Sequence, residues 1–309
     1  MKILLRIRNA LGSFYGAGEF YIRAVSKFIL TFLCLYGLVH AYDYLPYPGM
    51  TAAALFLSLV GMAFPWGFSL LTVAVLAVAD LFFFHPAAGA AGAVLAFVTA
   101  CLYLGFLKGR AQVVLLSGLG SALGLGAPVW IGVMLFRKRG DAARVLLGTF
   151  AGIALRLLFL FQGEAFSLDT LLQQILSAFG IVLQSPGLWG MVLAAGLTCL
   201  TVFLTVCIPL PYSLPMAACA GTVVMMLTEG MLWLAPGIGS GASIAVSTVL
   251  AAVLCIPLSL LLMVPVEGPA EYLQFEDDDY LYYVKAVPKL RASQEFSDIS
   301  AGTAERKNL

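Results

Sequence analysis

Apolar stretches of about 15 to 25 residues recur along this chain, and they constrain its fold more than any other feature. A helix of about 20 residues crosses the hydrocarbon core of a bilayer, which is roughly 30 Å thick. The 309 residues are 61% hydrophobic and 11% charged, with a mean hydropathy of +0.99. A soluble domain is about 45–50% apolar and cannot bury that much apolar surface. The sequence therefore predicts an all-α polytopic integral membrane protein.

The basic residues predict the orientation of the spans. Lys and Arg cluster before the first span, after the fourth and before the fifth, and none lies between Arg156 and Lys285. Because cytoplasmic loops are enriched in Lys and Arg, both termini are expected in the cytoplasm. We expect about eight transmembrane helices, at 28–42, 51–64, 68–84, 88–107, 145–161, 187–209, 214–235 and 242–264.

Three domains follow from this pattern. Residues 1–27 are expected to form a basic amphipathic helix on the inner membrane surface, because apolar residues recur there at helical spacing. Residues 28–266 form the transmembrane domain, and residues 267–309 form a short cytoplasmic tail. A second amphipathic helix is expected on the outer surface at about 167–184, where leucines and other apolar residues make one stripe.

The segment 112–136 does not fit a simple crossing. If it crossed the membrane once, the basic residues 137–139 would lie outside, so we expect two short halves that enter and return to the cytoplasmic side. The break is predicted at Gly124, Gly126 and Pro128, which interrupt a helix. Irregular backbone at membrane depth survives only when it is buried in protein or lines a cavity. The alternative is a kinked but ordinary span with a different span count.

Three ionisable residues lie inside predicted spans: Asp80, Arg156 and Glu229. Counted along their helices at about 1.5 Å per residue, they share one layer roughly 6–9 Å below the outer surface. A lone charge at the bilayer centre costs roughly 2.5–3.5 kcal/mol on insertion scales, so these residues should seek each other or water. One interpretation is a structural charge cluster that joins three helices. The other is a polar site that binds a cation, a proton or a cationic group.

The tail carries strand-favouring residues on both sides of an acidic run, which is compatible with a small β-hairpin. The run lacks the spaced ligands of an EF-hand loop, so a solvated turn is favoured over a calcium or partner site. The tail resembles that of a family of uncharacterised bacterial multi-pass membrane proteins, and the matching residues are Glu271, Tyr272, 274–278, Tyr280, Tyr282, Tyr283 and 284–289. The resemblance implies a bacterial cytoplasmic membrane and no established activity. Candidate interaction residues are Tyr272, Phe275, Tyr280, Tyr282 and Tyr283.

Two classes of function follow. The first is a transporter-like or channel-like protein built around the polar layer, and the alternative is a non-transporting scaffold or assembly subunit that acts through its tail. No His, Cys, Asp or Glu group has catalytic or metal-ligand spacing, so we expect no enzyme, cofactor or metal. The expected partners are the lipid bilayer and a cytoplasmic protein or a second copy of the chain. No basic patch predicts nucleic-acid binding.

Overall fold

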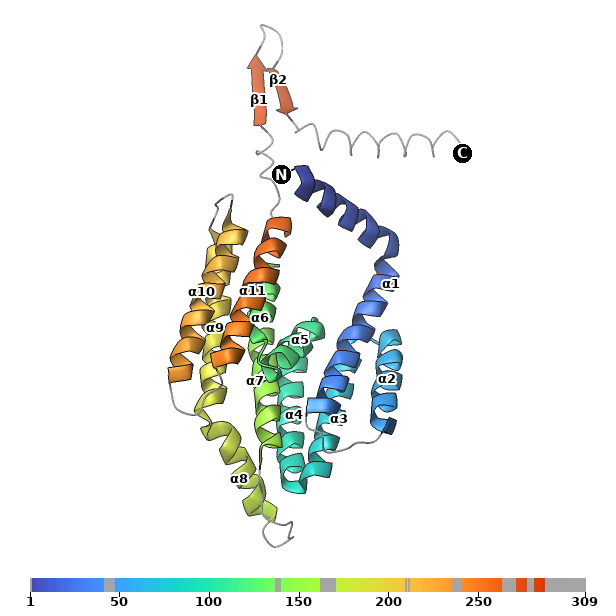
Figure 1. Cartoon of the computed structure of the whole chain (residues 1–309). Coiled ribbons are helices and arrows are strands. Elements are labelled where there is room, and N and C mark those ends of the chain that lie inside the picture. The colour runs from blue at the N-terminus through green and yellow to red at the C-terminus, as the bar shows by residue number, and fades with distance from the viewer. Residues whose placement is uncertain are drawn as a thin grey trace, which may run out of the picture. The chain divides into compact units, whose positions relative to one another are not determined.

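The computed structural model describes residues 2–41, 48–136, 140–161, 171–208, 210, 212–234, 241–262, 271–276 and 281–286. The chain divides into two compact units, Met1–Leu262 and Met263–Leu309. Within the described residues the first unit is helical (Figure 1). Its helices are α1 (Lys2–Ala41), α2 (Pro48–Ala63), α3 (Trp66–Phe84), α4 (Pro86–Phe106), α5 (Ala111–Ala122), α6 (Gly126–Leu135), α7 (Asp141–Phe159), α8 (Leu171–Gln184), α9 (Pro186–Cys207), α10 (Ser213–Leu234) and α11 (Gly241–Leu262).

Seven helical segments in the described part are long and apolar enough to cross a membrane: Gly18–Gly37, Trp66–Phe84, Pro86–Phe106, Asp141–Phe159, Pro186–Cys207, Ser213–Leu232 and Ala245–Leu262. They correspond to seven of the eight predicted spans. The remaining one, predicted at 51–64, is the 16-residue helix α2. At about 1.5 Å per residue α2 is roughly 24 Å long, shorter than the hydrocarbon core, so the count of eight spans stays a prediction.

Helix α1 bends at Gly18, where the backbone leaves the helical region (φ −120°, ψ 19°). The predicted boundary between the surface helix and the first span, at Lys27, lies inside the part that continues beyond this bend. Lys27 instead fixes α1 to the junction of α2 and α3. Its Nζ donates to the carbonyl of Phe64 and lies 5.8 Å from the centre of the Trp66 ring. A basic side chain therefore satisfies a carbonyl that α2 leaves unpaired at its C-terminal end.

His85 makes the sharp turn between α3 and α4. Its extended backbone ends α3, and its Nδ1 accepts a hydrogen bond from the amide of Ala87 (3.2 Å). Pro86 at the first position of α4 has no amide to satisfy. Helices α3 and α4 therefore pack side by side in opposite directions. The predicted outer amphipathic helix corresponds to α8, which packs against α4 and α7, while residues 167–170 lie outside the described part.

Two groups of helices make the main apolar cores. Helices α6, α9, α10 and α11 gather on one side, with α7 beside them (Figure 1). Leu81 of α3, the small residues Ala87, Ala88 and Ala91 of α4, and Leu158 of α7 belong to the second core, which α8 covers. Helix α7 contributes to both cores. Helix α9 does so too, through Leu188 in the second core and Ala194 in the first, so α7 and α9 together connect the two cores.

The second unit contains two strands, β1 (Glu271–Glu276) and β2 (Leu281–Ala286), paired antiparallel. Four of the candidate interaction residues lie in this pairing, which sets Phe275 opposite Tyr282 and Gln274 opposite Tyr283. Tyr272 is opposite Lys285. The fifth candidate, Tyr280, lies outside the described residues, as does the predicted acidic turn.

Candidate functional site

A broken helix pair, α5 and α6, occupies the interior of the first unit. The break covers residues 123–125. Gly124 has a left-handed backbone (φ +74°) that other residues rarely adopt, and the amide of Leu125 donates to the carbonyl of Gly120 (2.6 Å). The 12 residues of α5 and the 10 residues of α6 make helices of about 18 and 15 Å. Each is about half the length needed to cross a bilayer.

The broken pair starts and finishes at the same end of the bundle. Arg110, just before α5, forms an ion pair with Asp141, the first residue of α7. Helix α7 then runs alongside α5 in the same direction, because Ser121 Oγ lies 3.2 Å from Thr149 Oγ1. The connection from α6 to α7, residues 136–140, spans at most about 20 Å. Helix α6 must therefore run back toward the start of α5, as the re-entrant prediction for 112–136 requires.

The predicted break residues have different places in this pair. Gly124 forms the break itself. Gly126 is the first residue of α6, and Pro128 lies in the first turn of α6. A proline is tolerated in a first turn, because the amide that it lacks would have no partner inside the helix. Pro128 therefore helps to start the second half-helix and does not interrupt it.

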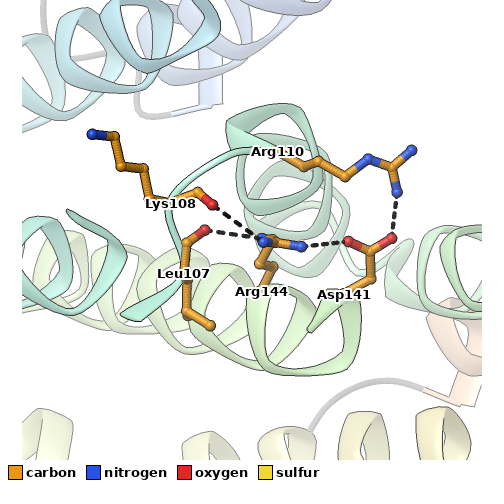
Figure 2. Close-up of polar contacts among 5 residues, drawn as sticks. All are labelled: Leu107, Lys108, Arg110, Asp141 and Arg144. Carbon is orange, nitrogen blue, oxygen red and sulfur yellow. Dashed lines mark hydrogen bonds and ion pairs between the residues drawn. The ribbon is translucent and has the colours of Figure 1, made fainter. Parts of the chain in front are cut away.

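A charged cluster lies at the end of the bundle where α5 and α7 begin (Figure 2). The Asp141 side chain is fully buried, and it accepts hydrogen bonds from Arg110 at Oδ2 and from Arg144 at Oδ1 (2.8 Å). Arg144 also donates to the carbonyls of Leu107 (2.9 Å) and Lys108 (3.3 Å), just after α4. One carboxylate and one guanidinium thus tie together the end of α4, the start of α5 and the start of α7. We call Arg110, Asp141 and Arg144 the entrance cluster.

Glycines let α5 and α7 approach closely along their length. A Cβ atom on Gly148 would overlap Ser117 Oγ and the carbonyl of Val114, and a Cβ atom on Gly152 would overlap the carbonyl of Gly118. Any larger residue at Gly148 or Gly152 would push the helices apart. The sequence analysis did not single out these glycines, although both lie in a small-residue pattern, Gly-Thr-Phe-Ala-Gly, which is typical of close helix packing in membranes.

Arg156 lies at the break. Its Nη1 is 3.5 Å from the carbonyl of Ala122, the last residue of α5. Ala122 is among the residues whose carbonyls lack a partner inside the helix, and the C-terminus of a helix carries partial negative charge. The guanidinium is exposed on the surface of the first unit. The structure thus brings together two features that the sequence predicted separately, the intramembrane arginine and the helix break.

The other two residues of the predicted polar layer lie on helices that do not pack together. Asp80 is half-buried on α3, which packs against α1, α2, α4, α5 and α7. Glu229 is 4% exposed on α10, which packs against α6, α9 and α11. Within the described residues no ion pair joins Asp80, Arg156 and Glu229. A shared depth along the sequence therefore does not produce a paired cluster in this structure.

The entrance cluster escaped the sequence analysis as a site. The sequence analysis used Arg110 and Arg144 only to predict the orientation of the spans. Asp141 was not considered as a site residue, because it lies just before a predicted span. One signal was available. Asp141 is the single acidic residue between Asp80 and Glu164, and it lies three residues before Arg144 on the same helix. An acidic residue three positions before an arginine at a helix start indicates a local ion pair.

The fold and this site define a helical polytopic membrane protein with a broken helix pair in its interior. Known proteins give no more specific assignment: no family model, curated protein or solved structure matches the chain. Within the described residues no group of three His, Cys, Asp or Glu side chains could hold a metal ion.

Proposed function

We propose that the protein transports a small solute across the bacterial cytoplasmic membrane and that the broken helix pair lines the path. The observation that carries this proposal is the break itself. Two half-helices end inside an apolar bundle, and non-helical backbone at such depth is tolerated where it is buried in protein or lines a cavity. In secondary transporters, discontinuous helices commonly form the substrate site. Arg156 and the Ser121–Thr149 hydroxyl pair supply polar groups next to the break.

The proposed orientation places the entrance cluster at the cytoplasmic face, with both termini on that side. Lys27 contacts Trp66, and Trp66 packs in one apolar cluster with Leu107 and Ala111, which flank the entrance cluster. Basic residues from three places in the chain thus meet at one end of the bundle. Such a concentration of Lys and Arg is typical of the cytoplasmic side.

The test is whether water reaches the break. Ser121 is buried, so a transport path must open to expose it. We expect a cysteine at Ser121, in a variant without its native cysteines, to react with a membrane-impermeant thiol reagent from at least one side of sealed vesicles. Ala218→Cys, buried between packed helices, and Leu204→Cys, exposed on the apolar surface of α9, are the controls and should stay unreactive. An unreactive Ser121→Cys from both sides would contradict the transport proposal.

A scaffold function is the second candidate, and one observation favours it. The two strands of the tail belong to a compact unit of their own. In this proposal the tail binds a cytoplasmic protein or a second copy of the chain. Removing residues 267–309 should then abolish a stoichiometric complex in membranes, measured by crosslinking and mass determination, and leave the labelling at the break unchanged. A tail-less chain that retains the complex would rule the scaffold function out.

A further inference from the structure

Four buried polar groups that make no hydrogen bond in the described structure lie on α6, α9, α10 and α11, the helices that supply most of the largest apolar core. Trp130 Nε1 on α6, Thr198 Oγ1 on α9 and Ser247 Oγ on α11 are buried without a hydrogen-bond partner in the described structure. The carboxylate of Glu229 on α10 is nearly as buried. For Glu229, too, the described residues provide no hydrogen bond or ion pair. Buried polar groups normally have partners, so this group requires an explanation.

The directions of the helices place these groups relative to the start of α6. Helix α9 runs opposite to α7, because Gly196 lies beside Leu146 and Trp189 contacts Phe150 further along. Helix α10 turns back from α9 after a short connection, so it runs in the direction of α7. Helix α6 ends beside the start of α7. Helices α6 and α10 are therefore antiparallel. The first residues of α6 lie at the level of the second half of α10.

Distances along the helices give the level of Glu229. A Cβ on Gly221 of α10 would lie 3.2 Å from Ile131 Cγ1 of α6 and would also touch Val202 of α9, so these three residues share one level. From this level, at about 1.5 Å per residue, Gly126 at the start of α6 is about 7.5 Å away and Glu229 is about 12 Å away in the same direction. Measured along the helix axes, the level of Glu229 is therefore about 4–5 Å beyond the level of the first residue of α6.

Helix α11 brings Ser247 to the same level. Cys255 Sγ lies 3.3 Å from the carbonyl of Pro128 and 3.9 Å from a Cβ on Gly132, which places it beside the middle of α6. Helix α11 turns back from α10, so it runs parallel to α6. Ser247 is eight residues before Cys255, about 12 Å along the axis, which places its level beyond the first residue of α6. Because α10 and α11 pack together, Glu229 and Ser247 occupy one layer beyond the end of α6.

The start of α6 offers hydrogen-bond donors toward this layer. The first amides of a helix have no partner inside it, and Leu125, which precedes α6, has no polar side chain to cap them. The Trp130 indole folds back over Gly126, since its Cε2 would lie 2.7 Å from a Cβ there. Nε1 is bonded to Cε2, so the unpaired indole N–H lies beside the first residue of α6. These donors and the helix dipole favour a negative charge.

Glu229 has no counter-charge on the helices around it. Helices α6, α9 and α11 contain no Asp, Glu, Lys, Arg or His, and Glu229 is the one charged residue of α10. The other titratable groups on these four helices are thiols: Cys199, Cys207, Cys219 and Cys255. The N–H donors oppose a metal cation, and too few oxygen atoms are present to coordinate one. A proton is the one cation that this arrangement can accept.

We propose that Glu229 is a reversible proton-binding site, with its ionised form stabilised through a bound water by the donors at the start of α6. A proton taken from water adds to a carboxylate oxygen, and its release restores the carboxylate. This inference deepens the proposed transport function, because a proton bound beside the broken helix pair is suited to drive it. It names the coupling ion and the residue that carries it.

Infrared difference spectroscopy of the full chain in lipid bilayers, recorded between neutral and acidic pH, tests the proposal. Protonation should produce the C=O stretch of a carboxylic acid, shifted in heavy water, with matching loss of carboxylate absorption. Glu229→Gln should remove one component of this band, that of the buried carboxylic acid, whereas Asp80→Asn, the matched change at a second carboxylate within a candidate span, should leave that component. The same difference spectrum in wild type and Glu229→Gln would overturn the proposal.

A second pair of variants keeps the test valid if Glu229→Gln does not fold. Trp130→Phe removes the indole N–H and should change the frequency of the C=O band. Trp189→Phe is the control, because Trp189 is half-exposed and its Nε1 donates to the carbonyl of Leu183 (2.7 Å). An unchanged band in Trp130→Phe would also count against the site. The infrared measurement does not depend on transport. If Glu229 binds a proton but Ser121→Cys does not react with the thiol reagent, the transport proposal is rejected and the proton site is retained.

Discussion

Asp141→Asn should be among the most destabilising single changes to a polar side chain in this protein. The substitution keeps the size of the side chain and removes its charge. Asp141 is completely buried and accepts a charged hydrogen bond on each oxygen, from Arg110 and from Arg144. An asparagine offers one acceptor oxygen in place of two. Both guanidinium groups would then lose their counter-charge at the junction of α4, α5 and α7.

The structure gives the size of the effect. A hydrogen bond to a charged group contributes about 1.5–3 kcal/mol, and removing one partner of a buried ion pair costs about 3–5 kcal/mol. The side chains of Arg110 and Arg144 are 28% and 12% exposed, so water compensates part of the loss. We therefore expect Asp141→Asn to lower the free energy of unfolding by about 2–4 kcal/mol. Arg144→Gln should cost more than Arg110→Gln, because Arg144 is more buried and also holds two carbonyls.

Reversible unfolding in mixed micelles, followed by far-UV circular dichroism, measures these differences. Glu19→Gln is the matched control, because Glu19 pairs with Arg23 on the surface and both side chains are exposed. It should change the free energy of unfolding by less than about 1 kcal/mol. A double-mutant cycle between Asp141→Asn and Arg144→Gln should show coupling of about 1 kcal/mol or more. The reasoning fails if Asp141→Asn is no more destabilising than Glu19→Gln.

Three further outcomes are expected. Gly148→Val should prevent α5 from packing on α7 and reduce the yield of folded protein in size-exclusion chromatography. Gly67→Ala, at a glycine with open space around it, should not reduce the yield. Equal yields of the two variants would contradict the close packing of α5 and α7. Arg156→Gln should change the free energy of unfolding by less than about 1 kcal/mol, since its contact with α5 is long; a larger loss in micelle unfolding would reveal a stronger partner. Topology reporters at Gln174 and Gly302 should give opposite signals, with Gln174 outside, and two equal signals would contradict the orientation.

The sequence by itself determined the class of protein and most of its helices, because the length of an apolar run and the places of glycine and proline are local properties. The membrane class follows from composition, and seven predicted spans correspond to long apolar helices. The break near Gly124 was also predicted, since a glycine readily takes the left-handed conformation that ends a helix, whatever surrounds it.

Tertiary structure alone decided which residues meet. Helices that are apolar on every side carry no stripe to show which face packs on a neighbour, so counting residues could place Asp80, Arg156 and Glu229 at one depth but not side by side. The fold sets Arg156 beside the last residue of α5, and it buries Glu229 on α10, which packs against α6, α9 and α11. It also joins Arg110 to Asp141 across 31 positions of sequence. These contacts depend on how α6 returns and how closely glycines let α5 approach α7, which no local pattern specifies.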